Sequence, residues 1–413
     1  MRQSQLFTRA QKNAPSDEPS RNAQLLIRAG FVNKEMAGVY SYLPLGLRVL
    51  RKIENIIREE MNAIGGQEIL MTTLQDPEIW KKSGRWVEEG EDESNGLPWF
   101  KTRLSNGGEL GIANTHEEAL TELLRRQLSS HKDLPIYTYQ IQNKFRNELR
   151  AKSGLMRGRE FLMKDLYSFN RNEEDFKEFY EKCAEAYLKI FERTGLGDIT
   201  FRTFASGGSF SKFSDEFQTL SEAGEDTIYL DEAKKIAVNK EVYTDDVLES
   251  LGLDKGKLIE KKAIEVGNIF TLGTRYSESI GLIYKDEDGK DRHPFMGSYG
   301  IGLGRLMGTI VEAMSDEAGI IWPRSVAPFD VHLVGLNGGQ GDKIYQDLQA
   351  QGVQVLYDDR ESSPGEKFAD ADLIGLPFRV VTSAKTGDQL EVKARNSKEA
   401  ALMDFDKFLE LIK

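Results

Sequence analysis

Cysteine is almost missing from this chain of 413 residues, and Cys183 is the only one. A disulfide within the chain is therefore excluded, as is a metal cluster built on cysteine thiolates. Histidine is also scarce, and the four residues do not have the spacing of metal ligands: His116, His131, His293 and His332. We therefore expect no metal centre held by cysteine or histidine.

Long hydrophobic runs are missing too. No apolar stretch is long enough to cross a membrane, and the opening segment MRQSQLFTRAQKNAPSDEPS lacks the apolar core of a secretion signal. We therefore expect a cytoplasmic protein with no membrane partner. The 55 basic residues are outnumbered by 67 acidic ones, which gives a net charge of −12. Such a balance disfavours a protein that coats nucleic acid, but it leaves room for a local basic patch.

The pattern of hydrophobic residues changes once along the chain. Apolar residues recur at helical spacing in residues 47–61 and 173–193, whereas residues 135–148 and 159–169 alternate like strands. Beyond Ala327, short strands alternate with helices, as in a small α/β domain with a largely parallel or mixed sheet. We place the boundary between the two parts at about residues 324–328.

A basic cluster occupies residues 144–164, in KFRNELRAKSGLMRGREFLMK. If the two strands predicted here pair as a hairpin, four unlike side chains converge on one ligand: Arg146, Glu148, Phe161 and Asp165. An arginine fork suits phosphate oxygens, a glutamate accepts from an amino group, and an aromatic ring stacks on a base. The pattern therefore predicts a nucleotide site. The alternative is an exposed hairpin with solvated charges, which is weakened by Asp165, because an acid on a buried face needs a partner.

The segment GSYGIGLGRLMG has glycines spaced as in a dinucleotide-binding fold. That fold is disfavoured, because no βαβ unit surrounds the glycines and no acidic partner is evident in a following strand. The apolar stripe after them instead places Arg305 in the first turn of a helix, where the helix dipole disfavours a cation. We therefore expect an anionic ligand near Arg305, although tight strand–helix packing accounts for some of the glycines.

The segment NTHEEALTEL looks like the start of a helix. Thr115 would cap this helix, and Glu117 and Glu118 would lie in its first turn, where acids are favoured. Taken alone, capping is the better interpretation of these residues. Only the resemblance described next changes that weighting.

Together these segments resemble the class II aminoacyl-tRNA synthetases and, within them, the bacterial-type prolyl-tRNA synthetases. Residues from about 44 to 72 are similar to class motif 1, those from about 142 to 169 to motif 2, and those from about 295 to 314 to motif 3. Four more specific segments favour the prolyl family: THEE, FLMKDLYSF, EVGNIFTLGTRYSE and YDDRESSPGEKFADADLIGLP. The match runs in order along nearly the whole chain.

The resemblance implies an α+β fold. Residues 1–326 would form an antiparallel catalytic sheet flanked by helices, and residues 327–413 an α/β anticodon-binding domain. The implied activity is that of a proline–tRNA ligase, which makes prolyl-adenylate from proline and ATP and passes the prolyl group to tRNA(Pro). Mg²⁺ would bridge the ATP phosphates, and motif 1 would form a homodimer. Positioning and charge stabilisation do most of such work, so no residue need act as a nucleophile.

Residue roles follow from the resemblance, position by position. The catalytic residues would be Arg146, on the α-phosphate, and Arg305, on the γ-phosphate, while Glu148 would contact the adenine amino group. The ATP site would comprise Arg146, Glu148, Arg157, Phe161, Glu216, Gln218, Gly302 and Arg305. The proline site would comprise Thr115, Glu117, Arg146, Met163, Asp165, Tyr167, Ser298 and Gly300. Arg150 and Lys152 would also meet phosphates.

The anticodon would be contacted by basic residues of the C-terminal domain: Arg360, Lys367, Arg379, Lys393 and Arg395. Asp359 and Glu361 would accept hydrogen bonds from guanine or cytosine edges. Ordinary surface charge is an equally good interpretation of each of these residues.

Five positions depart from the family pattern. Proline is usual where this chain has Thr72 and Asn114, and histidine is common where it has Asn170, Asp215 and Asn268. These changes bear on fine pocket geometry and on the dimer contact, and they leave the ATP-binding set intact.

The inserted editing domain of many bacterial relatives is a further difference. Only a short, mostly polar stretch joins Thr227 to Glu265, which is too little chain for a separate domain. We therefore expect that the protein does not clear mischarged alanyl-tRNA by itself.

Two other functions remain open. A non-catalytic paralogue could bind tRNA or regulate another protein, but such a paralogue should have lost the arginine of motif 2 or motif 3, and both are present. A class II ligase for another amino acid, such as threonine, fits the class motifs. A threonine enzyme would be expected to carry zinc ligands, and the single cysteine is unsuitably placed.

Overall fold

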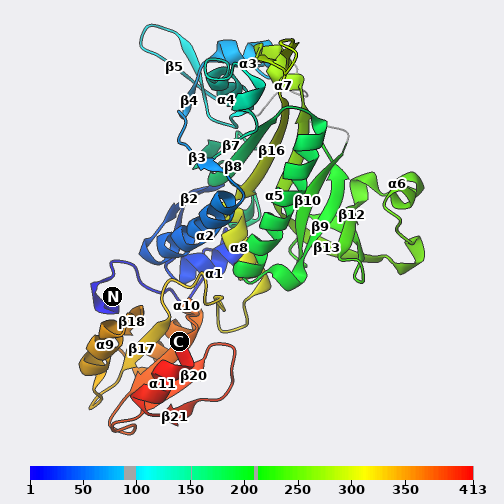
Figure 1. Cartoon of the computed structure of the whole chain (residues 1–413). Helices are drawn as coiled ribbons and strands as arrows, with labels where there is room; N and C mark the ends of the chain where they lie inside the picture. Colours follow the sequence, from blue (N-terminus) through cyan, green and yellow to red (C-terminus); the bar gives the residue numbers. More distant parts are fainter. Residues whose placement is uncertain (88–98, 150, 209–212, 413) are drawn as a thin grey trace.

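The computed structural model describes residues 1–87, 99–149, 151–208 and 213–412. A nine-stranded sheet forms the centre of the N-terminal part, in the order β10-β9-β12-β11-β13-β16-β8-β7-β3, with β10 also paired to β13 (Figure 1). Neighbouring strands are antiparallel, except that β12 runs parallel to β9 and β3 parallel to β7. The predicted antiparallel catalytic sheet is thereby confirmed. Its strands are β3 (Gln67–Glu68), β7 (Ile136–Phe145), β8 (Glu160–Asn170), β9 (Thr200–Ser206), β10 (Phe213–Leu220), β11 (Asp226–Asp231), β12 (Ile236–Asn239), β13 (Ile259–Gly273) and β16 (Phe295–Gly302).

Helices pack against one face of this sheet: α1 (Arg21–Arg28), α2 (Pro44–Ala63), α5 (Glu173–Arg193) and α8 (Leu303–Ala313). The apolar stripe of α2 is buried in the same core as Leu166 of β8. Leu47, which the helical spacing assigns to that stripe, is instead 43 % exposed. Since side chains alternate along a strand, Phe161, Met163 and Asp165 of β8 face the opposite side of the sheet. The helices therefore leave that side of the sheet open.

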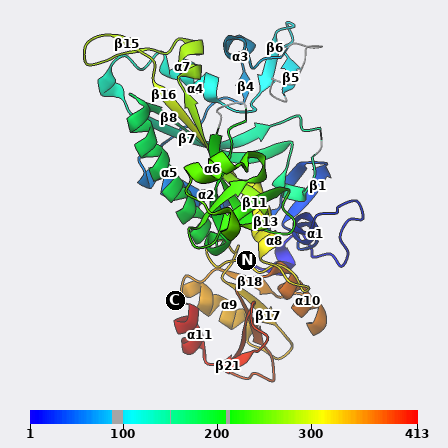
Figure 2. The same cartoon turned by 90° about the vertical axis from the view of Figure 1, so that its right-hand side faces the viewer.

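A small lobe lies at one end of the molecule, opposite the C-terminal domain (Figure 2). We call it the tryptophan lobe, because Trp80, Trp86 and Trp99 form its buried cluster. It consists of α3 (Pro77–Ser83), α4 (Glu117–Leu124), α7 (Arg275–Ile280), β4 (Leu74–Gln75), β5 (Phe100–Arg103) and β6 (Glu109–Ile112). Its strands pair in the order β4-β6-β5.

The polar stretch between motifs 2 and 3 belongs to the main sheet. It contains β11, β12 and α6 (Asp245–Ser250), and β11 pairs with β13. This arrangement is an extension of the sheet rather than a separately folded domain. The remaining short strands are β1 (Val32–Met36), β2 (Val39–Tyr42), β14 (Tyr284–Lys285) and β15 (Asp291–Arg292).

The C-terminal domain contains a five-stranded mixed sheet in the order β18-β17-β19-β20-β21. The strands β18, β17 and β19 are parallel, and β20 and β21 are antiparallel to their neighbours. Of the two predicted arrangements, a largely parallel or a mixed sheet, the mixed one is observed. The elements are β17 (Val331–Gly335), α9 (Gly341–Ala350), β18 (Val355–Asp358), α10 (Pro364–Ile374), β19 (Phe378–Thr382), β20 (Leu390–Ala394), β21 (Ala401–Met403) and α11 (Phe405–Ile412).

Several contacts join this domain to the rest of the chain, and two groups of them involve Asp316 and the first residues. Arg395 Nη2 and Nη1 lie 2.6 and 2.8 Å from the two carboxylate oxygens of Asp316, in the segment after α8. At the other end of the chain, Arg2 forms a parallel β-bridge with Tyr357 of β18, and Ser4 Oγ donates to Asp359 at 2.8 Å. The first residues therefore lie on the C-terminal domain. Among the described residues, no helix combines the length and apolarity needed to cross a membrane.

Candidate active site

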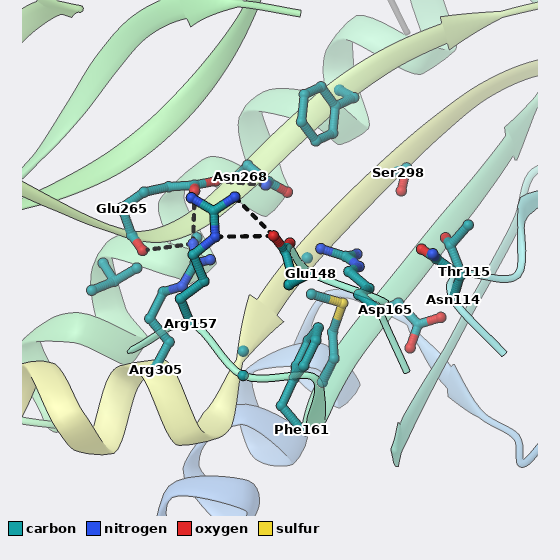
Figure 3. Close-up of a pocket in the computed structure, with 18 of the residues that line it drawn as sticks. Asn114, Thr115, Glu148, Arg157, Phe161, Asp165, Glu265, Asn268, Ser298 and Arg305 are labelled. Carbon is teal, nitrogen blue, oxygen red and sulfur yellow. Dashed lines mark hydrogen bonds and ion pairs between the residues drawn. The ribbon is translucent and has the colours of Figure 1, made fainter. Parts of the chain in front are cut away.

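A cavity of about 320 Å³ opens on the sheet face opposite the helices. Strands β8, β13 and β16 form its floor, the loop between β7 and β8 covers one side, and the start of α8 closes one end (Figure 3). The structure brings nearly all of the predicted ATP and proline residues to this cavity. Those that line it are Thr115, Glu117, Arg146, Glu148, Arg157, Phe161, Met163, Asp165, Tyr167, Ser298, Gly300, Gly302 and Arg305.

Glu216 and Gln218 are the two predicted residues that do not line the cavity. They lie on β10, and Gln218 Nε2 donates to Glu216 at 2.8 Å and to Asp226 at 2.8 Å. Burial and the nearby Glu265 raise the pKa of Glu216 to about 8. Glu265, which was not among the predicted site residues, faces the cavity in their place.

The hairpin expected from the basic cluster is confirmed, since β7 and β8 are antiparallel. Strand β7 ends at Phe145, so Arg146 and Glu148 lie just beyond it rather than on it. Arg146 N still donates to Arg159 O at 2.8 Å, which continues the pairing by one residue. Arg146 therefore comes beside Phe161, with its guanidinium carbon 5.2 Å from the centre of the ring. Burial and the nearby Arg305 lower the pKa of Arg146, and its buried Nε has no hydrogen-bond partner among the described residues.

The loop between these strands supplies one of its predicted basic residues to the cavity. Arg157 Nη2 and Nε donate to Glu148 Oε2 at 2.9 and 3.2 Å (Figure 3). Lys152 instead pairs with Glu225 at 3.3 Å. Arg159 donates to the backbone oxygens of Glu148 and Ala37. Arg150 lies outside the described residues.

Arg305 lies in the first turn of α8, as predicted. Its Nη1 is 2.6 Å from Glu265 Oε2, and its Nε donates to Met156 O at 2.8 Å. Asn268 Nδ2 donates to the other oxygen of Glu265 at 2.7 Å. A bulge in the pairing of β10 with β13 brings residues 265–268 all to the cavity wall. The acid in the apolar segment EVGNIF was the available signal for Glu265.

The other end of the cavity is built around Glu117. Helix α4 begins at Glu117 and its cap position is His116, so the prediction that Thr115 caps this helix is wrong. Thr115 Oγ1 donates to Glu117 Oε2 at 2.6 Å, and Ser298 Oγ lies 3.4 Å from Oε1. The Thr115 hydroxyl therefore orients the buried carboxylate of Glu117 instead of capping the helix.

Asp165 has the partners that a buried acid requires. Its carboxylate lies 2.8 Å from Lys144 Nζ, and it accepts from Gln140 at 3.0 Å and from Tyr167 at 2.9 Å. Burial opposes ionisation of Asp165, but the charge of Lys144 and the hydrogen bonds from Lys144 and Gln140 favour it, so the pKa is lowered. Burial and the charge on Lys144 lower the pKa of His116 to about 4, which keeps its ring neutral at pH 7.

The residues that depart from the family pattern are integrated into the structure. Asn114 and Asn268 line the cavity. Asp215 accepts from Tyr180 and pairs with Arg202 at 2.7 Å. Asn170 donates to Ser168 and to Phe295 O, and the Thr72 carbonyl lies 3.0 Å from His116 Nε2.

The residues proposed to bind the anticodon are not gathered on one free surface. Four of the five have partners within the chain: Arg360 with Asp358 and Asp370, Lys367 with Gly335 O, Arg379 with Asp372, and Arg395 with Asp316. Lys367 is also buried, and Asp359 forms an ion pair with Arg2 and accepts a hydrogen bond from Ser4. Lys393 lies half-buried on β20. Their contact with tRNA stays a prediction.

Comparisons with known proteins agree with this geometry. Residues 100–314 match the tRNA synthetase class II core domain (G, H, P, S and T), and residues 330–413 match an anticodon binding domain. The proline–tRNA ligase of Caulobacter sp. (strain K31) is 40 % identical, over 96 % of this chain and 94 % of the relative. That of Rickettsia canadensis (strain McKiel) is 37 % identical, over 97 % and 94 %.

Solved structures show the same fold. Prolyl-tRNA synthetase from Cryptosporidium parvum, complexed with L-proline and AMP, superimposes with a TM-score of 0.75 at 16 % identity, covering 95 % of this chain and 74 % of that one. The Giardia lamblia prolyl-tRNA synthetase, in complex with prolyl-adenylate, also has a TM-score of 0.75, at 18 % identity, covering 94 % and 75 %. On the strength of the curated relatives and of the two family domains, the chain belongs to the proline–tRNA ligases, within the class II aminoacyl-tRNA synthetases.

Proposed function

We propose that the cavity binds ATP at its Arg305 end and proline at its Glu117 end, and joins them as prolyl-adenylate before the prolyl group passes to tRNA(Pro). One observation carries this proposal. Two arginines, Arg146 and Arg305, line the same cavity as an aromatic ring, Phe161, and a buried carboxylate, Glu117. Phosphate, base and cation therefore each find a complementary side chain within one space.

At the nucleotide end, the adenine ring would stack on Phe161, and its amino group would donate to Glu148. Arg305 would bind the γ-phosphate, and its position in the first turn of α8 adds the positive end of the helix dipole. Arg157 would exchange its bond to Glu148 for phosphate oxygens, because both groups lie on the cavity wall. Gly302 has no side chain, so the ligand can come close to the backbone at this position.

At the amino-acid end, the imino cation of proline would meet Glu117 and Thr115. Met163, Tyr167, Ser298 and Gly300 would surround the ring. Asp165 would shape this pocket through Tyr167, since its own charge is already balanced by Lys144 at 2.8 Å.

The chemistry needs no nucleophilic side chain. A proline carboxylate oxygen attacks the α-phosphorus, the bond to the bridging oxygen breaks, and pyrophosphate leaves with that electron pair. Arg146 would stabilise the charge on the α-phosphate oxygens, and Arg305 the charge that gathers on pyrophosphate. Arg305 is held before the reaction by Glu265 and by the Met156 carbonyl, so it needs little reorganisation, and Arg146 lies beside the ring of Phe161.

Magnesium is the expected partner of ATP. Within the described part of the chain, no group of three or more His, Cys, Asp and Glu residues could hold a metal ion. Mg²⁺ needs no such cage, since it is commonly bound by one or two carboxylates together with substrate phosphates. Glu265 on the cavity wall fits that role, with Glu216 behind it. When bound, the ion would neutralise phosphate charge.

We also infer a homodimer, with β3 and the segment after it at its interface. Strand β3 is an edge of the main sheet, and the exposed apolar residues Leu70 and Leu74 follow it. An unpaired edge with exposed leucines is suited to pairing with a second copy. Sedimentation equilibrium would test this, and a strict monomer at micromolar concentration would contradict it.

Three further assignments stay part of the proposal: the division at residues 326 and 327, the reading of the anticodon by the C-terminal domain, and a cytoplasmic location, where the tRNA substrate is used. The match of residues 330–413 to an anticodon binding domain supports the first two.

The deciding experiment is ATP–pyrophosphate exchange, measured with each amino acid alone. We expect exchange with proline and charging of tRNA(Pro). Exchange with threonine or serine but not with proline would instead indicate a ligase for another amino acid. Exchange with none would indicate a non-catalytic paralogue.

A further inference from the structure

Arg85 lies where the tryptophan lobe meets the Glu117 end of the cavity. It is buried together with two acids, with 4 % of Arg85, 2 % of Glu117 and 0 % of Glu118 exposed. Its Nη1 lies 3.1 Å from Glu117 Oε2 and 3.1 Å from Glu118 Oε2, and it donates to Tyr276 Oη at 3.0 Å. One guanidinium therefore contacts both carboxylates of the first turn of α4.

The lobe holds this guanidinium in place. The Trp99 indole N–H donates to the backbone oxygen of Arg85 at 3.1 Å. The guanidinium carbon lies 5.4 Å from the centre of the Trp80 ring and 5.2 Å from that of Tyr276. Arg85 is thus fixed at its backbone and packed between two aromatic rings, which leaves its side chain little freedom to move.

The charges at this end of the cavity depend on Arg85. Burial opposes its ionisation, but Glu118 and Glu117 outweigh burial and raise the pKa, so Arg85 is a cation. Burial raises the pKa of Glu118 to about 7, against the opposing effect of Arg85. Ser83 Oγ also donates to Glu118 at 2.5 Å, which directs that carboxylate away from the cavity and toward α3. Glu117, in contrast, lines the cavity.

We propose that Arg85 is a positioning residue for the amino-acid half of the reaction. It fixes the Glu117 carboxylate against Thr115 and contacts the second carboxylate, which Ser83 turns toward α3, so that the Glu117 carboxylate is the one that faces the imino cation of proline. The cavity end near Arg305, where ATP is placed, does not depend on this arrangement. This inference rests on the proposed function, because it presupposes that proline binds at Glu117.

The first test is the Arg85→Met variant in ATP–pyrophosphate exchange. The KM for proline should rise by about tenfold to a hundredfold, the effect of losing one charge-assisted hydrogen bond from a buried carboxylate, while the KM for ATP stays unchanged. Arg85→Lys keeps the charge without the forked geometry, and it should recover part of the proline affinity.

The second test uses tetrahydrofuran-2-carboxylate, which has the ring and carboxylate of proline but an ether oxygen in place of the imino group. Its inhibition constant against proline should be the same in the wild type and in Arg85→Met, because it has no cation for Glu117 to bind. A merely structural role of Arg85 would instead distort the pocket for both ligands alike.

The matched control is Arg125→Met. Arg125 follows the same helix, α4, and pairs with Glu122 at 2.7 Å, but its side chain is 44 % exposed. It should leave both KM values unchanged. If Arg85→Met does not fold, Arg85→Met combined with Glu118→Gln removes the second carboxylate as well, and the same comparison of proline with ATP applies to it and to Arg85→Lys.

Equal losses for proline and ATP, or equal losses for proline and tetrahydrofuran-2-carboxylate, would overturn the positioning role. An unchanged proline KM in Arg85→Met would overturn it too. Failure of the proposed function has a different signature, since the wild-type protein itself would then show no exchange with proline.

Discussion

The guanidinium of Arg305 lies 2.6 Å from the carboxylate of Glu265, which links the first turn of α8 to β13 at one end of the cavity. A cation held in this way is in place before a phosphate arrives. Replacing Arg305 with alanine should therefore abolish detectable ATP–pyrophosphate exchange, a loss of at least about a hundredfold, since a fixed transition-state contact is removed. Near-normal exchange would contradict the γ-phosphate role. The side chain is 32 % exposed, so thermal unfolding should stay close to that of the wild type.

Glu265→Gln removes the negative charge of this side chain but keeps its size. Glutamine can still accept a hydrogen bond from Arg305. Burial is the largest cause of the raised pKa of Glu216, and the charge of Glu265, which the substitution removes, is the next. We expect the magnesium concentration for half-maximal exchange to rise, whereas the KM for proline should not change, because Glu265 is at the other end of the cavity. Chelation of divalent ions should stop exchange by the wild type. Identical magnesium curves for the two proteins would argue against a role for Glu265.

Arg395→Met tests the ion pair between the domains. The pair is bidentate, with nitrogen–oxygen distances of 2.6 and 2.8 Å. The hydrogen bonds from Arg395 stabilise the ionised form of Asp316 and hold its pKa well below its usual range. The loss of stability should be about 1 kcal/mol or less, because the Asp316 side chain is 46 % exposed. Charging of tRNA should fall more than exchange does, since only charging needs the C-terminal domain aligned with the cavity. Equal effects on both reactions would oppose this.

His332 predicts a pH dependence of stability. It is buried on β17 with Nε2 3.0 Å from Gln3 Oε1, and burial lowers its pKa from 6.5 to about 4. Between these two pH values the unfolded chain binds more protons than the folded one. The contribution of His332 to the free energy of unfolding is therefore fully present above pH 6.5 and is lost as the pH falls toward 4. The contribution approaches about 3 kcal/mol. His332→Gln should show a shallower acid dependence in urea unfolding, and parallel curves would refute the assignment. His116 also has a lowered pKa, and it contributes equally to the acid dependence of the wild type and of His332→Gln.

The sequence predicted the large elements from local pattern, and it predicted most of the site residues from the resemblance to the prolyl-tRNA synthetases. The alternation in β7 and β8 specified which side chains share a face, and the stripe after the glycines placed Arg305 in the first turn of α8. Both follow from fixed periodicities of the backbone. Leu47 shows the limit of this argument, since helical spacing alone does not tell which end of a stripe reaches the core.

The features that escaped prediction depend on contacts distant in sequence. Arg85 is brought to Glu117 by the packing of the tryptophan lobe, and Glu265 reaches the cavity through a bulge that no local pattern marks. Thr115 looked like a cap because its neighbours fit a capping sequence, but its hydroxyl donates to Glu117 Oε2 instead of accepting from a backbone N–H. In the C-terminal domain, the pairing of Arg379 with Asp372 likewise escaped prediction, while the contact of this domain's basic residues with tRNA stays a prediction.

The seating of the first residues on β18 has a consequence for synthesis. Ser4 donates to Asp359 and Arg2 pairs with the same carboxylate, so these contacts close a loop that includes most of the chain. Loop closure of this length costs entropy before any contact repays it, and such contacts form slowly. On the ribosome, Arg2 and Ser4 must wait unpaired until β18 has been made. Their contacts with β18 and Asp359 should therefore be among the last parts of the molecule to form and, by the same reasoning, among the first to open under mild denaturation.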